Sequence, residues 1–257
     1  MRKRFGRVEA LRGVDFMIPS GGKVGLIGPN ASGKSTLIRI ILRLLQCEGE
    51  LLLDGEKKRR MELADRIAYV PQIAPKFGAS VGEVIKAITR VRQISPDAVF
   101  TCGNEVGIDL RAVERQAFCN LSGGAKQKTL ISLALASQAS LYVLDEPTAS
   151  LDTQSRRDMF HLLSERTEGA TLILCSHRLE EIRTLVDRVM VLEEGRLAEH
   201  NRRADEERRR QRRACPNGVP TRGCWLVEPH RDPLREARPR CTALSEPRRA
   251  NPESTRA

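Results

Sequence analysis

The fold of this chain is decided by residues 23–35, KVGLIGPNASGKS. Residues 23–27 form a short apolar run that is typical of a buried parallel strand, and residues 28–35 fit the pattern G-x-x-x-x-G-K-[ST]. Residues 35–45 follow with apolar side chains at helical spacing. We therefore predict a strand, a phosphate-binding loop and a helix, in which the loop's backbone N–H groups and the helix dipole surround phosphate oxygens.

The polar residues of this loop have separate expected roles. Lys34 would reach the β- and γ-phosphates of a nucleotide, and the hydroxyl of Ser35 would complete the shell of a magnesium ion. The alternative is a glycine-rich turn that carries an exposed lysine and binds nothing. The flanking strand and helix favour the nucleotide site.

A pair of carboxylates follows a second buried strand, Leu141–Leu144. Asp145 lies at the carboxyl end of that strand, where open α/β sheets bind ligands, and would hold the metal. Glu146 would act as the general base for the attacking water. Two acids after a strand can also be the start of a solvated loop, but pairing with the phosphate loop favours the catalytic interpretation.

The rest of the first 200 residues predicts an α/β body. A half-buried antiparallel strand is expected through Val8–Phe16, ending at Pro19. Between Gln72 and Asn120 the strand signal is absent, and we expect a small helical insertion there. Its expected helices are Val81–Arg92 and Leu110–Phe118, with breaks at Ser95-Pro96 and Gly103-Asn104. Short apolar runs predict further strands at Glu50–Leu53, Ile67–Val70, Leu172–Cys175 and Val189–Leu192.

Composition excludes several classes of protein. No apolar run reaches the roughly 18–20 residues of a membrane-spanning helix, so we expect no span in this chain. The seven cysteines contain no Cys-x-x-Cys pair, which argues against a disulfide framework or a zinc site and favours a reducing cytosol. Aromatic residues make up only 4% of the chain, which argues against a base-stacking surface.

The net charge of +11 lies mostly in the last 57 residues. Residues 201–257 hold 15 arginines, no lysine, 8 acidic residues and 7 of the 13 prolines, without apolar periodicity. We predict a disordered tail, solvated and without function, of the kind that an out-of-frame reading of GC-rich DNA encodes. The alternative is a polybasic arm that binds anionic lipid or nucleic acid, although no specific nucleic-acid partner is expected.

A third motif, Leu121-Ser122-Gly123-Gly124-Ala125-Lys126-Gln127, lies upstream of the carboxylates. Gln72 follows Tyr69-Val70-Pro71, Ser150-Leu151-Asp152 follows the carboxylates, and Ser176-His177 follows the last central strand. With these motifs in this order, residues 5–200 resemble the nucleotide-binding subunit of ATP-binding-cassette (ABC) proteins. The resemblance implies a P-loop NTPase (RecA-like) core of class α/β, with a small antiparallel β part and an inserted helical subdomain. The expected ATPase domain is residues 1–200, with its helical insertion at about 73–120.

The resemblance also implies a head-to-tail sandwich of two chains around two ATP–magnesium sites. The chain would form a homodimer or pair with a related ABC subunit, and hydrolysis would power a separate transmembrane permease subunit. Its place would be the cytoplasm, peripheral on the inner face of the cell membrane. Soluble ABC proteins of translation, DNA repair or iron–sulfur assembly are the alternative, but the single set of motifs and the short insertion favour transport.

The resemblance assigns residues to three groups. His177 and Gln72 join Glu146 as catalytic residues, and Ser35, Gln72 and Asp145 hold the metal. Phe5 would stack on adenine, although a plain packing role is nearly as plausible. The residues expected to bind the nucleotide are Phe5, Gly28, Asn30, Ala31, Ser32, Gly33, Lys34, Ser35, Thr36, Ser122, Gly123, Gly124 and Asp152.

The sequence departs from the family at its start. Members usually begin with a β-strand before the aromatic residue, whereas Met1 lies four residues before Phe5, so we expect this edge strand to be missing. Either the true start of the protein lies upstream of Met1, or this form of the protein is impaired by the missing edge strand. We call residues 121–127 the signature motif. Its alanine, Ala125, together with residues 174–177 and 191–195, resembles the sequence of single-cassette subunits of ABC-2-type exporters, including those that serve copper-enzyme maturation.

Overall fold

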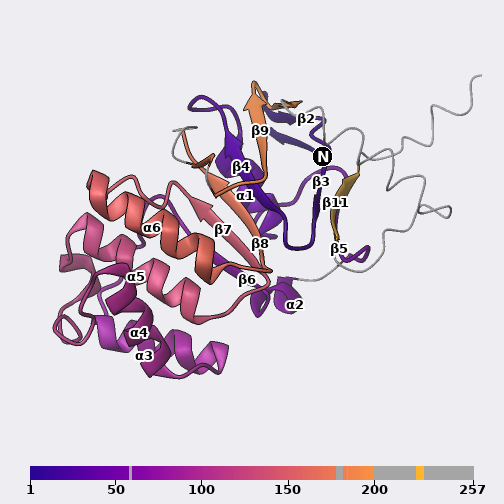
Figure 1. Cartoon of the computed structure of the whole chain (residues 1–257). Coiled ribbons are helices and arrows are strands. Elements are labelled where there is room, and N and C mark those ends of the chain that lie inside the picture. The colour runs from indigo at the N-terminus through magenta and orange to yellow at the C-terminus, as the bar shows by residue number, and fades with distance from the viewer. Residues whose placement is uncertain (58–59, 178–181, 184, 200–223, 229–257) are drawn as a thin grey trace, which may run out of the picture.

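A six-stranded sheet forms the centre of the molecule in the computed structural model, which describes residues 1–57, 60–177, 182–183, 185–199 and 224–228 (Figure 1). From edge to edge its strands are β10 (Arg196–Glu199), β9 (Arg188–Glu193), β4 (Lys23–Ile27), β8 (Thr171–Cys175), β7 (Leu141–Asp145) and β6 (Ile67–Val70). The first of these is antiparallel to its neighbour, and the other five are parallel. The predicted P-loop NTPase fold is confirmed.

Both faces of this sheet are covered, which explains why its strands are continuous apolar runs. Along β7, Tyr142 and Leu144 belong to one hydrophobic core, while Leu141 and Val143 belong to the other. The first core includes residues of α3 (Val81–Arg92), α4 (Pro96–Val106), α5 (Gly123–Ala136) and α6 (Thr153–Arg166). Figure 1 shows these helices together on one side of the sheet, with α1 (Lys34–Ile41) and the antiparallel strands on the other side.

The antiparallel part consists of two small sheets. In one, β1 (Arg2–Phe5) pairs with β2 (Val8–Arg12). In the other, β3 (Phe16–Pro19), β11 (Cys224–Glu228) and β5 (Glu50–Leu53) lie in that order, and the short helix α2 (Arg60–Ala64) follows further along the chain. The single strand predicted over Val8–Phe16 is therefore wrong, because the chain leaves β2 at Gly13, where φ is +87°.

The expectation that no strand precedes Phe5 is also wrong. β1 ends at Phe5, and the chain turns back through Gly6 and Arg7 so that Phe5 pairs with Val8. Gly6 has a φ of +57°, a left-handed conformation that favours glycine.

The helical insertion is confirmed as helical, but one of its helices is misplaced. Residues Leu110–Gln116 form turns and a bend, and a 3-10 helix covers Phe118–Asn120. Instead, Pro96 occupies the first turn of α4, and Ser95 caps it by accepting a hydrogen bond from the N–H of Asp97. Gly103 lies inside this helix, and a Cβ atom there would meet the side chain of Leu110 at 2.7 Å, so the close packing of Leu110 favours glycine at this position.

The tail was expected to contain no regular structure, and β11 contradicts this for residues 224–228. Its backbone pairs antiparallel with both neighbours, with Leu226 opposite Met17 and Leu52. The expectation for residues 200–223 and 229–257 lies outside the described residues. Within the described part of the chain, no helix is long and apolar enough to cross a membrane.

Removal of residues 201–257 is expected to lower the melting temperature by several degrees. β3 and β5 are each paired with β11 and not with each other. Each of these strands therefore loses its backbone hydrogen bonds to β11, and each such bond contributes about 1 kcal/mol. Thermal melts of the full chain and the truncated chain measure this effect. A chain ending at Glu228 keeps β11 and serves as the control, and equal melting temperatures for all three chains would contradict a stabilising role of the strand.

Candidate functional site

A cavity of about 490 Å³ lies at the carboxyl ends of β4, β6 and β7. The phosphate loop follows the first of these strands, Gln72 follows the second and Glu146 follows the third. The predicted residues that line this cavity are Asn30, Ala31, Ser32, Gly33, Lys34, Ser35, Thr36, Gln72, Asp145 and Glu146. Three separate segments of sequence therefore meet at one edge of the sheet, where α/β proteins bind ligands.

The phosphate loop places a cation over its own backbone. α1 begins at Lys34, directly after Gly33, whose φ of +109° is a left-handed value. The Nζ of Lys34 donates hydrogen bonds to the carbonyl oxygens of Gly28 and Pro29, at 2.6 and 2.9 Å. The ammonium group is thus held at the mouth of the loop, where a phosphate would meet it and the N-terminus of the helix together.

Ser32 supports the interpretation of the loop as an anion site. Its side chain is 3% exposed and lines the cavity, yet its hydroxyl has no hydrogen-bond partner within the described ranges. A buried hydroxyl without a partner is costly, and a phosphate oxygen would accept a hydrogen bond from it. The loop therefore fits the triphosphate of a nucleotide by shape, by charge and by an available donor.

Two buried carboxylates face the loop across the cavity. Asp145 and Glu146 are 5% and 8% exposed. Burial, and then the neighbouring carboxylate of Glu146, raise the pKa of Asp145 above its ordinary value, while Lys34 and Arg39 act in the opposite direction. The anionic form of Asp145 is thus destabilised, and a bound cation would relieve this cost.

His177 contacts one of these carboxylates. Its Nδ1 lies 2.9 Å from Oε2 of Glu146. The backbone of Glu146 is also fixed, since its N–H donates to the carbonyl oxygen of Cys175 at 3.0 Å and its φ is +49°. A glutamate held in the left-handed region is uncommon, and such conformations concentrate at functional sites.

The residues of the signature motif lie outside the cavity of their own chain. Ser122 caps α5 by accepting a hydrogen bond from the N–H of Ala125 at 3.2 Å, and Gly123 and Gly124 form the first turn of that helix. Asp152 caps α6 by accepting a hydrogen bond from the N–H of Ser155 at 2.9 Å. None of these four predicted residues lines the cavity of its own chain.

Phe5 is not among the residues that line the cavity either. Its side chain is 47% exposed, and the Nζ of Lys3 lies 5.3 Å from the centroid of its ring. Stacking of Phe5 on adenine therefore stays a prediction. The wall on this side is formed by residues that the sequence did not point to, namely Val8, Glu9, Ala10, Arg12, Glu194 and Gly195.

Ala31 carries backbone strain within the phosphate loop. Its φ is +64°, a conformation that costs a residue with a Cβ atom about 1–2 kcal/mol. Ala31→Gly should therefore raise the free energy of unfolding by up to about 1 kcal/mol, after the entropy lost by glycine is subtracted. Denaturant unfolding measures the change.

Ala134, inside α5, provides the matched control for this substitution. Ala134→Gly should destabilise the protein by about 1 kcal/mol, because glycine is unfavourable inside a helix. Equal destabilisation by both glycine substitutions would show that Ala31 carries no strain.

The comparison with known proteins agrees with this site. A family model described as "ABC transporter" matches residues 11–149, a range that contains the phosphate loop, the signature motif and the carboxylate pair. The chain belongs to the ABC transporter family. This family member is the ATP-hydrolysing subunit of a transporter.

Two curated relatives illustrate the match. The chain is 32% identical to the zinc uptake system ATP-binding protein ZurA of Listeria innocua, over 72% of this chain and 77% of that protein. It is 35% identical to the aliphatic sulfonates import ATP-binding protein SsuB of Rhodopseudomonas palustris, over 77% of this chain and 70% of that protein. Other relatives include a Nod factor export protein and a lipid A-core flippase, so the comparisons favour no single cargo and the ABC-2 exporter type stays a prediction.

Solved structures of ABC proteins share the fold. A bacterial Atm1-family ABC exporter with ATP bound gives a TM-score of 0.71 at 28% identity, covering 81% of this chain and 38% of that one. The ATP-binding cassette MJ0796, in a dimeric post-hydrolysis state bound to ADP and Pi, gives 0.69 at 25% identity, covering 78% of this chain and 94% of that one.

Proposed function

We propose that this ABC subunit hydrolyses ATP in its cavity with Glu146 as the general base. The observation that carries the assignment is the contact between Oε2 of Glu146 and Nδ1 of His177 beside the phosphate loop. With Nδ1 protonated, His177 donates to the carboxylate and orients it. Lys34 binds the β- and γ-phosphates, and the backbone N–H groups of residues 30–35 surround their oxygens.

The proposed hydrolysis needs one proton acceptor. A water molecule attacks the γ-phosphorus, its proton passes to the carboxylate of Glu146, and the bond between the γ-phosphorus and the bridging oxygen of ADP breaks. The products are ADP and inorganic phosphate. His177 would stabilise the position of the base, and Gln72, which lines the same cavity, would contact the attacking water.

Magnesium is the metal that this donor set fits best. Ser35, Gln72 and Asp145 would hold it, since all three line the cavity and offer oxygen atoms. The raised pKa of buried Asp145 is the feature that a divalent cation would reverse. When bound, Mg²⁺ supplies positive charge that neutralises the phosphates.

We further propose that each ATP is enclosed by two chains. The signature residues Ser122, Gly123 and Gly124 begin a 14-residue helix and do not line their own cavity. Their backbone N–H groups and the positive end of α5 would instead meet the γ-phosphate held by a second chain. We assign this role to residues 1–200, with β11 completing the small sheet between β3 and β5, and the dimer would work in the cytoplasm against a permease in the membrane.

The dependence of hydrolysis on protein concentration tests this proposal. If two chains complete each site, the specific ATPase activity of the purified protein rises with its concentration and reaches a plateau when sedimentation shows a dimer. Removal of divalent cations with a chelator should abolish hydrolysis, and Mg²⁺ should restore it. A specific activity that stays constant across dilutions at which the protein is monomeric would contradict the shared site.

A further inference from the structure

The turn between β9 and β10 lines the cavity of the nucleotide site, although none of the predicted nucleotide-binding motifs includes it. Glu193 pairs with Arg196, so the turn consists of Glu194 and Gly195 alone. Their φ angles are +46° and +74°, both in the left-handed region. Two central residues with positive φ define the type I′ turn, the tightest connection between antiparallel strands.

Gly195 joins this turn to two parts of the site through its backbone. Its N–H donates to the carbonyl oxygen of Ser32 in the phosphate loop, at 3.0 Å. Its own carbonyl oxygen accepts a hydrogen bond from the N–H of Arg12 in β2, at 2.7 Å. Gly195 thus connects the phosphate loop with the strand that lines the other wall of the cavity.

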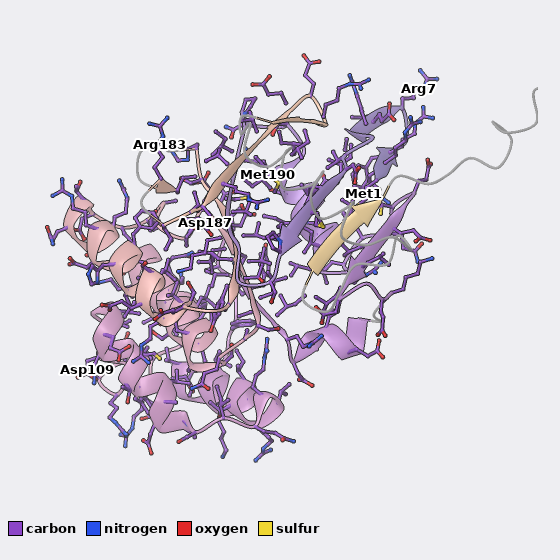
Figure 2. The ribbon with its side chains drawn as sticks, turned by 45° about the vertical axis from the view of Figure 1, so that its right-hand side comes forward. Met1, Arg7, Asp109, Arg183, Asp187 and Met190 are labelled. Carbon is purple, nitrogen blue, oxygen red and sulfur yellow. The ribbon has the colours of Figure 1, made fainter. Side chains whose placement is uncertain are left out.

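These backbones approach so closely that no Cβ atom fits between them. A Cβ on Gly195 would lie 2.7 Å from the carbonyl oxygen of Ala10, and a Cβ on Gly33 would lie 2.7 Å from the same oxygen. A Cβ on Gly28 would lie 2.1 Å from the carbonyl oxygen of Leu192, in β9. The phosphate loop therefore lies between β2 and β9, and Gly195 is hydrogen-bonded to both the loop and β2. Figure 2 marks Met190 on β9, and the ribbon can be followed from there to the turn.

We propose that Gly195 is a positioning residue of the ATP site, which fixes the phosphate loop relative to β2. It touches no phosphate in this role. It acts through the carbonyl of Ser32 and the contact with Ala10, because rigid backbone contacts cannot absorb an added atom without a shift of the loop. Displacement of a binding loop by a fraction of an ångström weakens its hydrogen bonds to a ligand steeply.

Substitutions at Gly195 and at Gly169 separate this role from simple backbone strain. Gly169 has a φ of +73°, almost the value at Gly195, but a Cβ there would meet nothing within 4 Å. Alanine at either position incurs the left-handed strain, and asparagine tolerates that conformation better. We expect Gly169→Ala to lower the melting temperature by a few degrees and Gly169→Asn to restore most of it, with ATP affinity unchanged in both.

At Gly195 both substitutions should weaken ATP binding by about tenfold or more, because asparagine also carries the Cβ atom that meets Ala10. Calorimetric titration with ATP, at a temperature where circular dichroism shows all four variants folded, gives the affinities. Gly195 variants that bind ATP as tightly as the Gly169 variants would overturn the proposal. The inference rests on the loop as the ATP site, and failure of the unsubstituted chain to bind ATP would instead refute the proposed function.

Hydrogen exchange provides a test that does not depend on folding of a variant. In the unsubstituted protein, ATP should protect the amides of residues 30–35, and the amide of Gly195 should gain protection with them. Protection of the loop without any change in the peptide that contains Gly195 would show that the turn does not respond to the site.

Discussion

Glu146→Gln should lower the steady-state rate of ATP hydrolysis by about 10²–10⁴-fold, because the amide cannot accept the proton of the attacking water. Glutamine has the same shape and can still meet Nδ1 of His177, so the cavity should keep its form. ATP should therefore bind and remain bound. Loss of the negative charge of Glu146 also removes a repulsion between the cavity and the anionic nucleotide, so ATP binding should become slightly stronger.

Single-turnover hydrolysis and equilibrium binding of ATP distinguish the lost base from a lost site. Sedimentation of Glu146→Gln with ATP and Mg²⁺ should show a dimer, because ATP that is not hydrolysed stays bound between the two chains and holds them together. Glu193→Gln, which changes an exposed carboxylate at the end of β9, is the matched control and should hydrolyse ATP normally. A Glu146→Gln chain with full activity would refute the assignment of the base.

A mixture of Lys34→Ala and Ser122→Arg chains should hydrolyse ATP, although neither chain does so alone. Lys34→Ala removes the cation that binds the phosphates and should weaken ATP binding by about 10–100-fold. Ser122→Arg places a large side chain where the N-terminus of α5 would approach the γ-phosphate of the partner. In a mixed dimer one site carries both substitutions, and the other site carries neither.

Titration of one variant with the other measures this complementation, and the activity should pass through a maximum near equal amounts. The control replaces the Ser122→Arg chain with one that carries both substitutions, because every cavity then lacks Lys34 and no activity should return. Absence of activity in the first mixture, while each variant still binds its partner, would contradict a site shared between two chains.

The sequence determined the chemistry of the site, because its motifs are local and each follows a strand. The loop at residues 28–35, the acids Asp145 and Glu146, and His177 all come directly after apolar runs that form parallel strands. Parallel strands place their carboxyl ends at one edge of the sheet, so the motifs had to converge. The same apolar runs predicted the central sheet and the two-sided core.

Helix boundaries and turns were less predictable, because they depend on contacts between distant residues. Gly103 predicts a break in a helix, yet it lies inside α4, where the close side chain of Leu110 leaves no room for a Cβ atom. Leu110–Phe118 has a helical pattern, but the N–H groups of Val81 and Gly82 bond to the carbonyls of Gln116 and Glu114 and hold the segment as turns. Tertiary contacts override propensity at such positions.

Only the tertiary structure determined which residues form the other wall of the cavity and which residues hold the phosphate loop in position. Val8, Ala10 and Arg12 belong to a strand with an ordinary alternating pattern, and Gly195 is one turn glycine among many. Their importance lies in backbone distances, such as that between the carbonyl of Ala10 and the positions of Gly33 and Gly195. Contacts made by backbone atoms leave little trace in side-chain patterns, so the sequence identified the residues that carry the chemistry and the three-dimensional packing identified those that hold them in place.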